Sequence, residues 1–233
     1  MRLDLQATVA KRLDEPNEDV CGTLPFRHRY ALSDGATESF APRQWAQVVV
    51  QAFLDRQAVD RDWICRASAR YARGFDRVKM SWIAQAAFDR GSFATLLGLT
   101  LDPGRRTAQV LGIGDSLAIL GDSRGIQAKF PYQTAIQFRQ RPLLLASHLA
   151  NNARLLAPGA MAQATVQWSL RGLHDPVLLL VTDALGAWLL SDPAARWVRL
   201  LRLRNRVQLD SLVRAERACG RMRCDDTTLL RIR

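Results

Sequence analysis

The sequence predicts an α+β fold with largely antiparallel sheets. Two observations support this prediction: strand-like segments come in consecutive pairs joined by turns, and helix-like segments gather in two places along the chain. A regular alternation of strands and helices would instead favour a doubly wound parallel sheet. The chain shows no internal repeat and no low-complexity linker, so we expect a single domain over residues 1–233.

The individual elements follow from hydrophobic spacing and turn residues. Period-two alternation, or short apolar runs between turns, predicts strands at 3–9, 28–33, 92–101, 106–113, 116–120, 125–130, 163–170, 177–182 and 227–232. Helical spacing of apolar residues predicts helices at about 42–56, 60–88, 184–190, 194–203 and 207–219. Gly74 is expected to bend or interrupt the second of these helices.

Composition and charge limit the classes of protein and partner. No apolar run approaches the ~18 residues of a membrane span, the start lacks the apolar core of a signal peptide, and the four cysteines are scattered. We therefore expect a cytoplasmic protein with reduced thiols and no membrane contact. The net charge of +11 is nearly all arginine, much of it after Arg196, which indicates either a solvated helix face or attraction to acidic partners. The scarcity of aromatic residues in that stretch disfavours nucleic acid as the partner.

Several carboxylates share one placement, at the end of an apolar strand or beside a turn residue. They are Glu18, Asp19, Asp34, Asp115, Asp183, Asp225 and Asp226. Carboxylates that converge repel one another unless a cation neutralises them. Oxygen ligands suit hard ions such as Mg²⁺ or Mn²⁺, and a pair of such ions can activate water and clamp a phosphate oxygen.

Six short motifs occur in a fixed order along the chain. They are Asn17-Glu18-Asp19, Ser33-Asp34-Gly35, Gly91-Ser92-Phe93-Ala94-Thr95, Gly114-Asp115-Ser116, Val181-Thr182-Asp183 and Asp225-Asp226-Thr227-Thr228. In this order they resemble the landmarks of the metal-dependent protein phosphatases of type 2C, over about residues 5–232. The resemblance implies a four-layer α-β-β-α sandwich, with two packed and mainly antiparallel sheets flanked by helices.

The resemblance also implies which residues hold two Mg²⁺ or Mn²⁺ ions. Asp34 would bridge both ions and so take part in catalysis, and the carbonyl of Gly35 would bind one of them. Asp183 and Asp225 would complete the shell of the other ion, with Asp226 as the alternative to Asp225 if the register shifts by one residue.

Further roles follow from the same resemblance. Glu18 and Asp19 would orient waters bound to the ions, and Asp89 resembles a ligand for a third ion. Gly114-Asp115-Ser116 is expected to form a structural turn and not to supply ligands.

Two positions depart from the family pattern. Members usually carry a phosphate-binding arginine four residues before the glutamate of the Glu-Asp motif, where this chain has Asp14. Arg12 is the candidate replacement if the turn that follows it bulges, and otherwise it is a solvated charge at a strand end. Many members also have a leaving-group histidine after the Asp-Gly motif, where this chain has Ala36.

These residues lead to two hypotheses about function. The first is a Mg²⁺- or Mn²⁺-dependent serine/threonine phosphatase in cellular signalling, which hydrolyses phosphoproteins with water activated by the metals. Its expected partners are a kinase or the targets of that kinase. The alternative is a catalytically silent binding or regulatory module on the same scaffold, suggested by the displaced arginine and the missing histidine.

Overall fold

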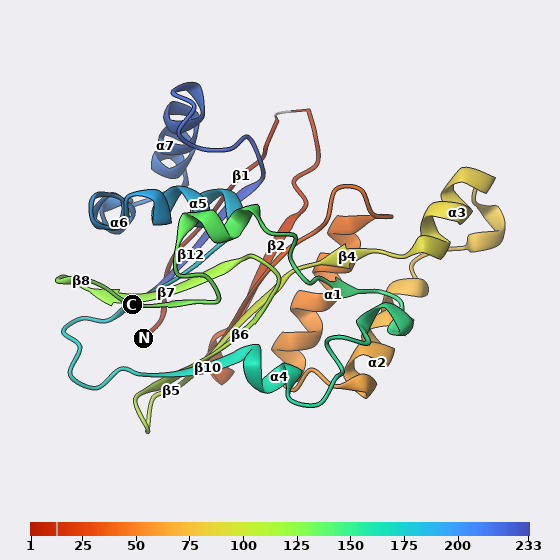
Figure 1. Cartoon of the computed structure of the whole chain (residues 1–233), viewed down its shortest axis with the longest axis horizontal. Helices are drawn as coiled ribbons and strands as arrows, with labels where there is room; N and C mark the ends of the chain where they lie inside the picture. Colours follow the sequence, from red (N-terminus) through yellow and green to blue (C-terminus); the bar gives the residue numbers. More distant parts are fainter. Residues whose placement is uncertain (13) are drawn as a thin grey trace.

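The computed structural model describes residues 1–12 and 14–233. Within these ranges, two five-stranded sheets form the centre of the molecule, and every strand pair in them is antiparallel (Figure 1). The first sheet has the order β1 (Leu3–Val9), β12 (Thr227–Ile232), β11 (Val177–Val181), β7 (Leu117–Asp122) and β8 (Gly125–Phe130). The second has the order β10 (Thr165–Ser169), β6 (Thr107–Ile113), β5 (Leu96–Asp102), β3 (Arg29–Asp34) and β2 (Asp19–Leu24). The short strands β4 (Phe93–Ala94) and β9 (Leu145–Ala146) pair separately.

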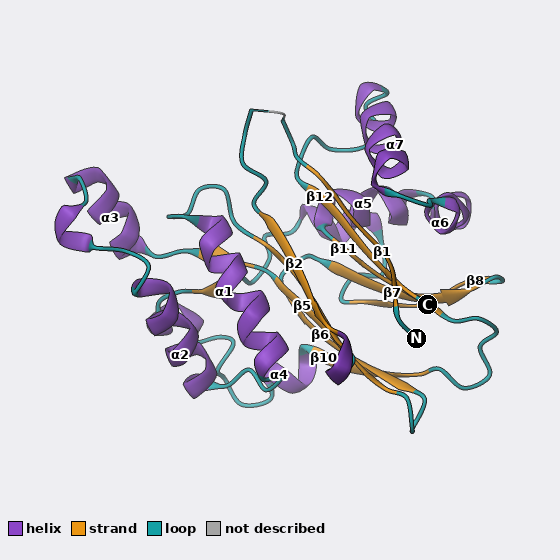
Figure 2. Cartoon of the chain, turned by 180° about the vertical axis from the view of Figure 1, so that it is seen from behind, coloured by secondary structure: helices purple, strands orange, loops and turns teal. Residues whose placement is uncertain are grey.

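Helices cover the outer face of each sheet, so the molecule has four layers (Figures 1 and 2). The helices are α1 (Pro42–Asp55), α2 (Arg61–Ala72), α3 (Trp82–Arg90), α4 (Ala160–Gln163), α5 (Asp183–Ser191), α6 (Pro193–Arg202) and α7 (Arg206–Ala218). α1 and α2 pack on the second sheet, and α5, α6 and α7 pack on the first. The expected four-layer α-β-β-α sandwich is therefore confirmed.

The alternation of side chains along the strands creates this layering. In β7, Leu117 and Ile119 belong to the core beneath the helices, whereas Ala118 and Leu120 face the core between the two sheets. Successive residues of a strand point to opposite faces, so a strand buried on both faces is apolar throughout. β7 and β11 have this character because each lies inside its sheet with a helical layer on one side and the other sheet on the other.

Two expectations about the elements need correction. The helix expected over about 60–88 is two helices, α2 and α3, because the chain turns after Ala72 and Ser81 caps a new helix by accepting a hydrogen bond from the backbone of Ala84 at 3.3 Å. Trp82 and Ile83, expected on the buried face, are 78% and 62% exposed. The sequence reasoning also missed β2, whose side chains are mostly half-buried and lack a clear alternation.

Among the residues that the structure describes, no helix combines the length and the hydrophobicity that crossing a lipid bilayer requires.

Candidate metal centre

Acidic residues from five chain segments gather at one end of the two sheets. Asp34 ends β3, and Asp19 begins the neighbouring β2 directly opposite it. Asp115 lies in the link from β6 to β7, Asp183 follows β11, and Asp225 precedes β12. Because neighbouring antiparallel strands run in opposite directions, the end of one strand lies beside the start of the next. The topology thus brings these separated carboxylates to one edge of the sandwich.

Four of these carboxylates line one pocket of about 190 Å³. They are Asp34, Asp115, Asp183 and Asp225. The remaining walls include Gly35, Thr95 and Leu144. Asp115 and Asp183 are buried, and Asp34 and Asp225 are half-buried.

Threonine and glycine residues hold the backbone around Asp34. The N–H of Asp34 donates to Thr95 Oγ1 at 2.9 Å, and Thr95 Oγ1 lies 2.9 Å from Ser116 Oγ. Gly114 has a φ of +99°, and a Cβ there would lie 2.6 Å from Thr95 Cγ2. Only glycine fits both the conformation and the space. The motifs around Thr95 and Gly114 therefore act as the support that positions Asp34.

Asp19 and Glu18 stand behind the pocket and do not line it. Asp19 is buried, and its Oδ2 accepts hydrogen bonds from Thr182 Oγ1 at 3.1 Å and Thr228 Oγ1 at 2.7 Å. Glu18 accepts a hydrogen bond from Thr37 Oγ1 and lies 3.5 Å from the ammonium of Lys11. Both acids are thus fixed by neighbours, as expected of residues that orient ligands and waters.

Asp225 and Asp226 have different environments. Asp225 lines the pocket, whereas Asp226 accepts from the backbone N–H groups of Lys11 at 2.7 Å and Glu18 at 2.6 Å. A carboxylate whose two oxygens accept hydrogen bonds from backbone N–H groups stabilises the backbone around it. The geometry therefore favours Asp225 over Asp226 as the residue that faces a ligand.

The electrostatics of the cluster are those of crowded, desolvated anions. Burial is the main cause that raises the pKa of Asp34 well above its usual range, and repulsion from Asp19 and Asp115 adds to it. Burial likewise raises the pKa of Asp19 to about 7, against the hydrogen bond from Thr228. Burial also raises the pKa of Asp115. Such a cluster is stabilised by a cation.

The donor set fits hard divalent ions. The Oδ1 atoms of Asp19 and Asp183 are buried and have no hydrogen-bond partner among residues 1–12 and 14–233, so they are available as ligands. All the candidate ligands are oxygens, which Mg²⁺ and Mn²⁺ prefer. As they stand, no three acidic, histidine or cysteine side chains of the described chain are close enough to enclose an ion. The guanidinium of Arg223 instead pairs with Asp183 and lies 3.5 Å from Asp225.

Comparisons with solved structures show that other proteins share the fold of this chain. The Mycobacterium tuberculosis serine/threonine phosphatase PstP/Ppp is 17% identical and superposes with a TM-score of 0.60, covering 99% of this chain and 98% of that one. The catalytic domain of PstP in complex with two manganese ions is 20% identical, with a TM-score of 0.57 and the same coverage. PppA, a key regulatory component of T6SS in Pseudomonas aeruginosa, is 16% identical with a TM-score of 0.54, covering 100% of this chain and 99% of that one. No protein-family model and no curated protein matches the sequence.

The chain has the fold of the bacterial type 2C serine/threonine phosphatases.

Besides Glu18 and Asp19, two further residues expected from this phosphatase resemblance, Arg12 and Asp89, do not line the pocket. Arg12 is 70% exposed on its side chain and pairs with Glu15 at 2.6 Å. Asp89, at the end of α3, forms a two-pronged ion pair with Arg77. The pairing lowers the pKa of Asp89 and occupies both of its oxygens. The structure thus brings neither residue to the four carboxylates.

Sequence reasoning missed three residues of the site. Asp115 was expected in a structural turn, but it lines the pocket. Arg217 donates to the carbonyls of Ala10 and Asp225 and so ties the loop before β12 to the end of β1. Arg223 contacts Asp183 directly. Only Asp115 carried a signal in the sequence, its place after an apolar strand, because the partners of the two arginines lie elsewhere in the chain.

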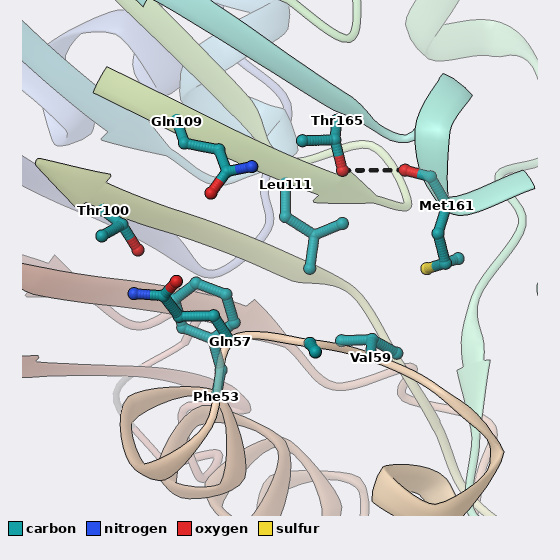
Figure 3. Close-up of a pocket in the computed structure, with 9 residues that line it drawn as sticks. Phe53, Gln57, Val59, Thr100, Gln109, Leu111, Met161 and Thr165 are labelled. Atoms are coloured by element: carbon teal, nitrogen blue, oxygen red, sulfur yellow. Dashed lines mark hydrogen bonds between the residues drawn. The ribbon is translucent and has the colours of Figure 1, made fainter. Parts of the chain in front are cut away.

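A second hollow, of about 300 Å³, lies on the outer face of the second sheet (Figure 3). Its walls include Phe53 of α1, Leu111 of β6, and Thr165, which donates to the carbonyl of Met161 at 2.8 Å. The described residues that line it carry no ionisable group. It therefore offers space and a few polar atoms but none of the chemistry of the acidic pocket.

Proposed function

We propose that the chain is a Mg²⁺- or Mn²⁺-dependent phosphoprotein phosphatase that hydrolyses phosphoserine and phosphothreonine, and that residues 1–233 act as one catalytic domain. The observation that carries the proposal is the pocket lined by Asp34, Asp115, Asp183 and Asp225, which come from four separate segments. Four carboxylates at the edge of a rigid double sheet have no evident structural use, and burial raises the pKa of two of them, Asp34 and Asp115.

The proposed ligands are the residues already in the pocket. Asp34 and the carbonyl of Gly35 would hold one ion, with Asp34 shared, and Asp183 and Asp225 would hold the other. Two such ions lower the pKa of a water and neutralise charge on the phosphoryl oxygens. Thr95 contributes by fixing the backbone of Asp34, and Glu18 and Asp19 contribute by orienting water beside the ligands.

The proposed substrate is a phosphorylated protein. Solved structures with this fold are named serine/threonine phosphatases, and one of them holds two manganese ions. A protein phosphatase opposes a kinase, so we propose a kinase or its targets as the partner.

The proposal predicts manganese-dependent hydrolysis of p-nitrophenyl phosphate or a phosphothreonine peptide. Asp34→Asn keeps the shape of the side chain but removes its charge, so activity should fall by about 100-fold or more, as for loss of a group acting at the transition state. Asp210→Asn is the matched control, since Asp210 is a helix-surface acid whose one ion pair among residues 1–12 and 14–233 is with Arg214. Wild-type activity no greater than that of Asp34→Asn would refute the proposal.

The alternative is a silent regulatory module on the same scaffold. It is favoured by one observation, the contact of Arg223 with Asp183, which places a positive charge beside a carboxylate proposed to hold an ion. A similar fold belongs to PppA, which is named a regulatory component. Calorimetric titration with Mn²⁺ separates the two ideas, because the silent module should bind no ion at micromolar to millimolar concentration while the phosphatase should bind at least one.

A further inference from the structure

We propose that Arg223 provides the guanidinium that binds the substrate phosphate, supplied from the loop before β12 and not from the N-terminal region. The inference rests on the proposed phosphatase function and adds to it a specific residue for gripping the phosphoryl group. The first observation is that Asp14 occupies the position at which the phosphatase family that this chain resembles has its phosphate-binding arginine.

The other cations near the N-terminal region are already engaged. Arg12 pairs with Glu15 on the surface, with its side chain 70% exposed. The ammonium of Lys11 lies 3.4 Å from Glu15 and 3.5 Å from Glu18, and it also donates to Thr37. Arg12 and Lys11 therefore pair with Glu15 and Glu18, which do not line the pocket, whereas Arg223 pairs with two carboxylates that do.

Arg223 is already at the pocket, and part of its fork is free. Its Nη2 donates to Asp183 Oδ2, and its Nε lies 3.5 Å from Asp225 Oδ2. Its Nη1 makes no hydrogen bond to any residue within 1–12 and 14–233. The side chain is 49% exposed, so a ligand can reach this free end of the guanidinium.

The contact with Asp183 leaves room for an ion on the same carboxylate. Arg223 engages Oδ2, whereas Oδ1 of Asp183 is buried and has no partner within the described chain. The two oxygens can therefore serve two purposes, one holding the guanidinium and the other open to a cation. Asp183 would then contact both Arg223 and the ion, and so hold the guanidinium next to the ion.

The loop that carries Arg223 is anchored just after that residue. Arg217 donates to the carbonyl of Asp225, and Asp226 accepts from the backbone of Lys11 and Glu18. These contacts fix the backbone two and three residues beyond Arg223. A guanidinium held in this way loses little further freedom on binding, and its planar fork matches two phosphate oxygens better than an ammonium does.

The test compares Arg223→Ala and Arg223→Lys with wild type, after melting curves have established that each variant is folded. Arg171→Ala is the matched control, because Arg171 is exposed in the turn before β11, at the opposite end of that strand from Asp183. Three quantities are measured: KM and kcat for p-nitrophenyl phosphate, binding of inorganic phosphate to the manganese-loaded protein by calorimetry, and binding of Mn²⁺ alone.

Loss of one charge-assisted phosphate contact should weaken phosphate binding and raise KM by about 10- to 100-fold in Arg223→Ala. Arg223→Lys should recover part of that loss. The affinity for Mn²⁺ should stay the same or rise, since removing a cation from beside Asp183 and Asp225 deepens the negative potential there. A merely structural role would instead weaken Mn²⁺ and phosphate together.

Unchanged phosphate binding in Arg223→Ala would overturn the inference, as would a joint loss of Mn²⁺ and phosphate binding. The inference would also fail if Arg12→Ala or Lys11→Met carried the phosphate loss in its place. Because phosphate binding is measured without turnover, its dependence on Arg223 can hold even if wild type shows no hydrolysis, a result that would count against the proposed function alone.

Discussion

At the residue scale, two aspartates that are adjacent in the sequence have different roles in the site. Asp225 lines the pocket while Asp226 accepts from two backbone N–H groups, although the two are adjacent in the sequence. Adjacent residues at the start of a strand point to opposite sides, so one faces the pocket and the other faces the N-terminal segment. Identical side chains thus take different roles through orientation alone.

Asp115 provides a residue-scale prediction. Its carboxylate lines the pocket, and burial raises its pKa. We expect Asp115→Asn to lower manganese-dependent kcat/KM or manganese affinity by about 10- to 100-fold, as losses beside a metal commonly do. The melting temperature without metal should stay the same or rise, because a repelling charge is removed.

Steady-state kinetics, calorimetry and thermal melting of the purified variant check these expectations. If the Asp115→Asn protein had wild-type kinetics and manganese affinity, the prediction would be contradicted, and Asp115 would be only part of a structural turn.

At the element scale, the arginine-rich C-terminal stretch is largely used inside the protein. Arg199 and Arg221 pair with Glu216, which is buried in α7 and also accepts from Trp188 Nε1 at 2.9 Å. Arg231 donates to the carbonyls of Leu200 and Leu203 at the end of α6. The positive charge of this stretch therefore helps join α5, α6 and α7 to the first sheet, and a role in binding acidic partners is not needed to explain it.

Glu216 provides an element-scale prediction. Ion pairs with Arg221 and Arg199, together with Trp188, hold its pKa well below the usual range. Glu216→Gln should reduce the free energy of unfolding by roughly 1 to 3 kcal/mol, less than the ~3–5 kcal/mol for a fully buried pair because both arginines are about half exposed.

Urea denaturation measures this change. In the control Asp210→Asn, loss of the exposed pair with Arg214 should cost about 0.5 kcal/mol or less. Equal effects in the two variants would mean that Glu216 does not join the three helices.

At the scale of the whole molecule, the double sheet is a rigid scaffold that holds mutually repelling carboxylates close together at one edge. The two sheets meet through a buried apolar core, which includes Leu32, Leu99, Leu180 and Leu230. That core gives the strands little freedom to relax, so the acids at their ends stay close together. The energy of the metal-free state should therefore depend on the protonation of the acids.

The prediction at this scale concerns how the stability of the folded protein depends on pH and on bound Mn²⁺. The folded pKa of Asp19, about 7, lies above its unfolded value of 3.8, so the folded state binds the proton more tightly. This contribution to stability is present below about pH 4 and is lost as the pH rises toward about 7. With a chelator, the melting temperature should be higher at about pH 5 than at about pH 7.5, and the difference should shrink in Asp19→Asn.

Manganese at 100 times its dissociation constant should restore about 2.7 kcal/mol at the higher pH. Differential scanning calorimetry checks both parts. A melting temperature that rises with pH in the presence of chelator would contradict this account.

Most of the elements, and the acids at their ends, can be predicted from local sequence. Period-two alternation located β1, short apolar runs next to turns located β5, β6 and β12, and the motif order indicated the fold class, because all are local properties of the chain. The prediction failed for β2, whose half-buried faces lack a clear pattern, and for the helix expected over about 60–88, where local spacing could not show that Trp82 is exposed.

Which charged side chains come into contact depends on the folded structure. Asp115 joins the pocket, whereas Asp89 is held by Arg77, and no sequence spacing distinguishes the two cases. Arg223 lies beside Asp183, which is 40 residues away in the chain. Charge contacts between distant segments depend on strand order and loop anchoring, and these are properties of the folded double sheet and not of any local run of residues.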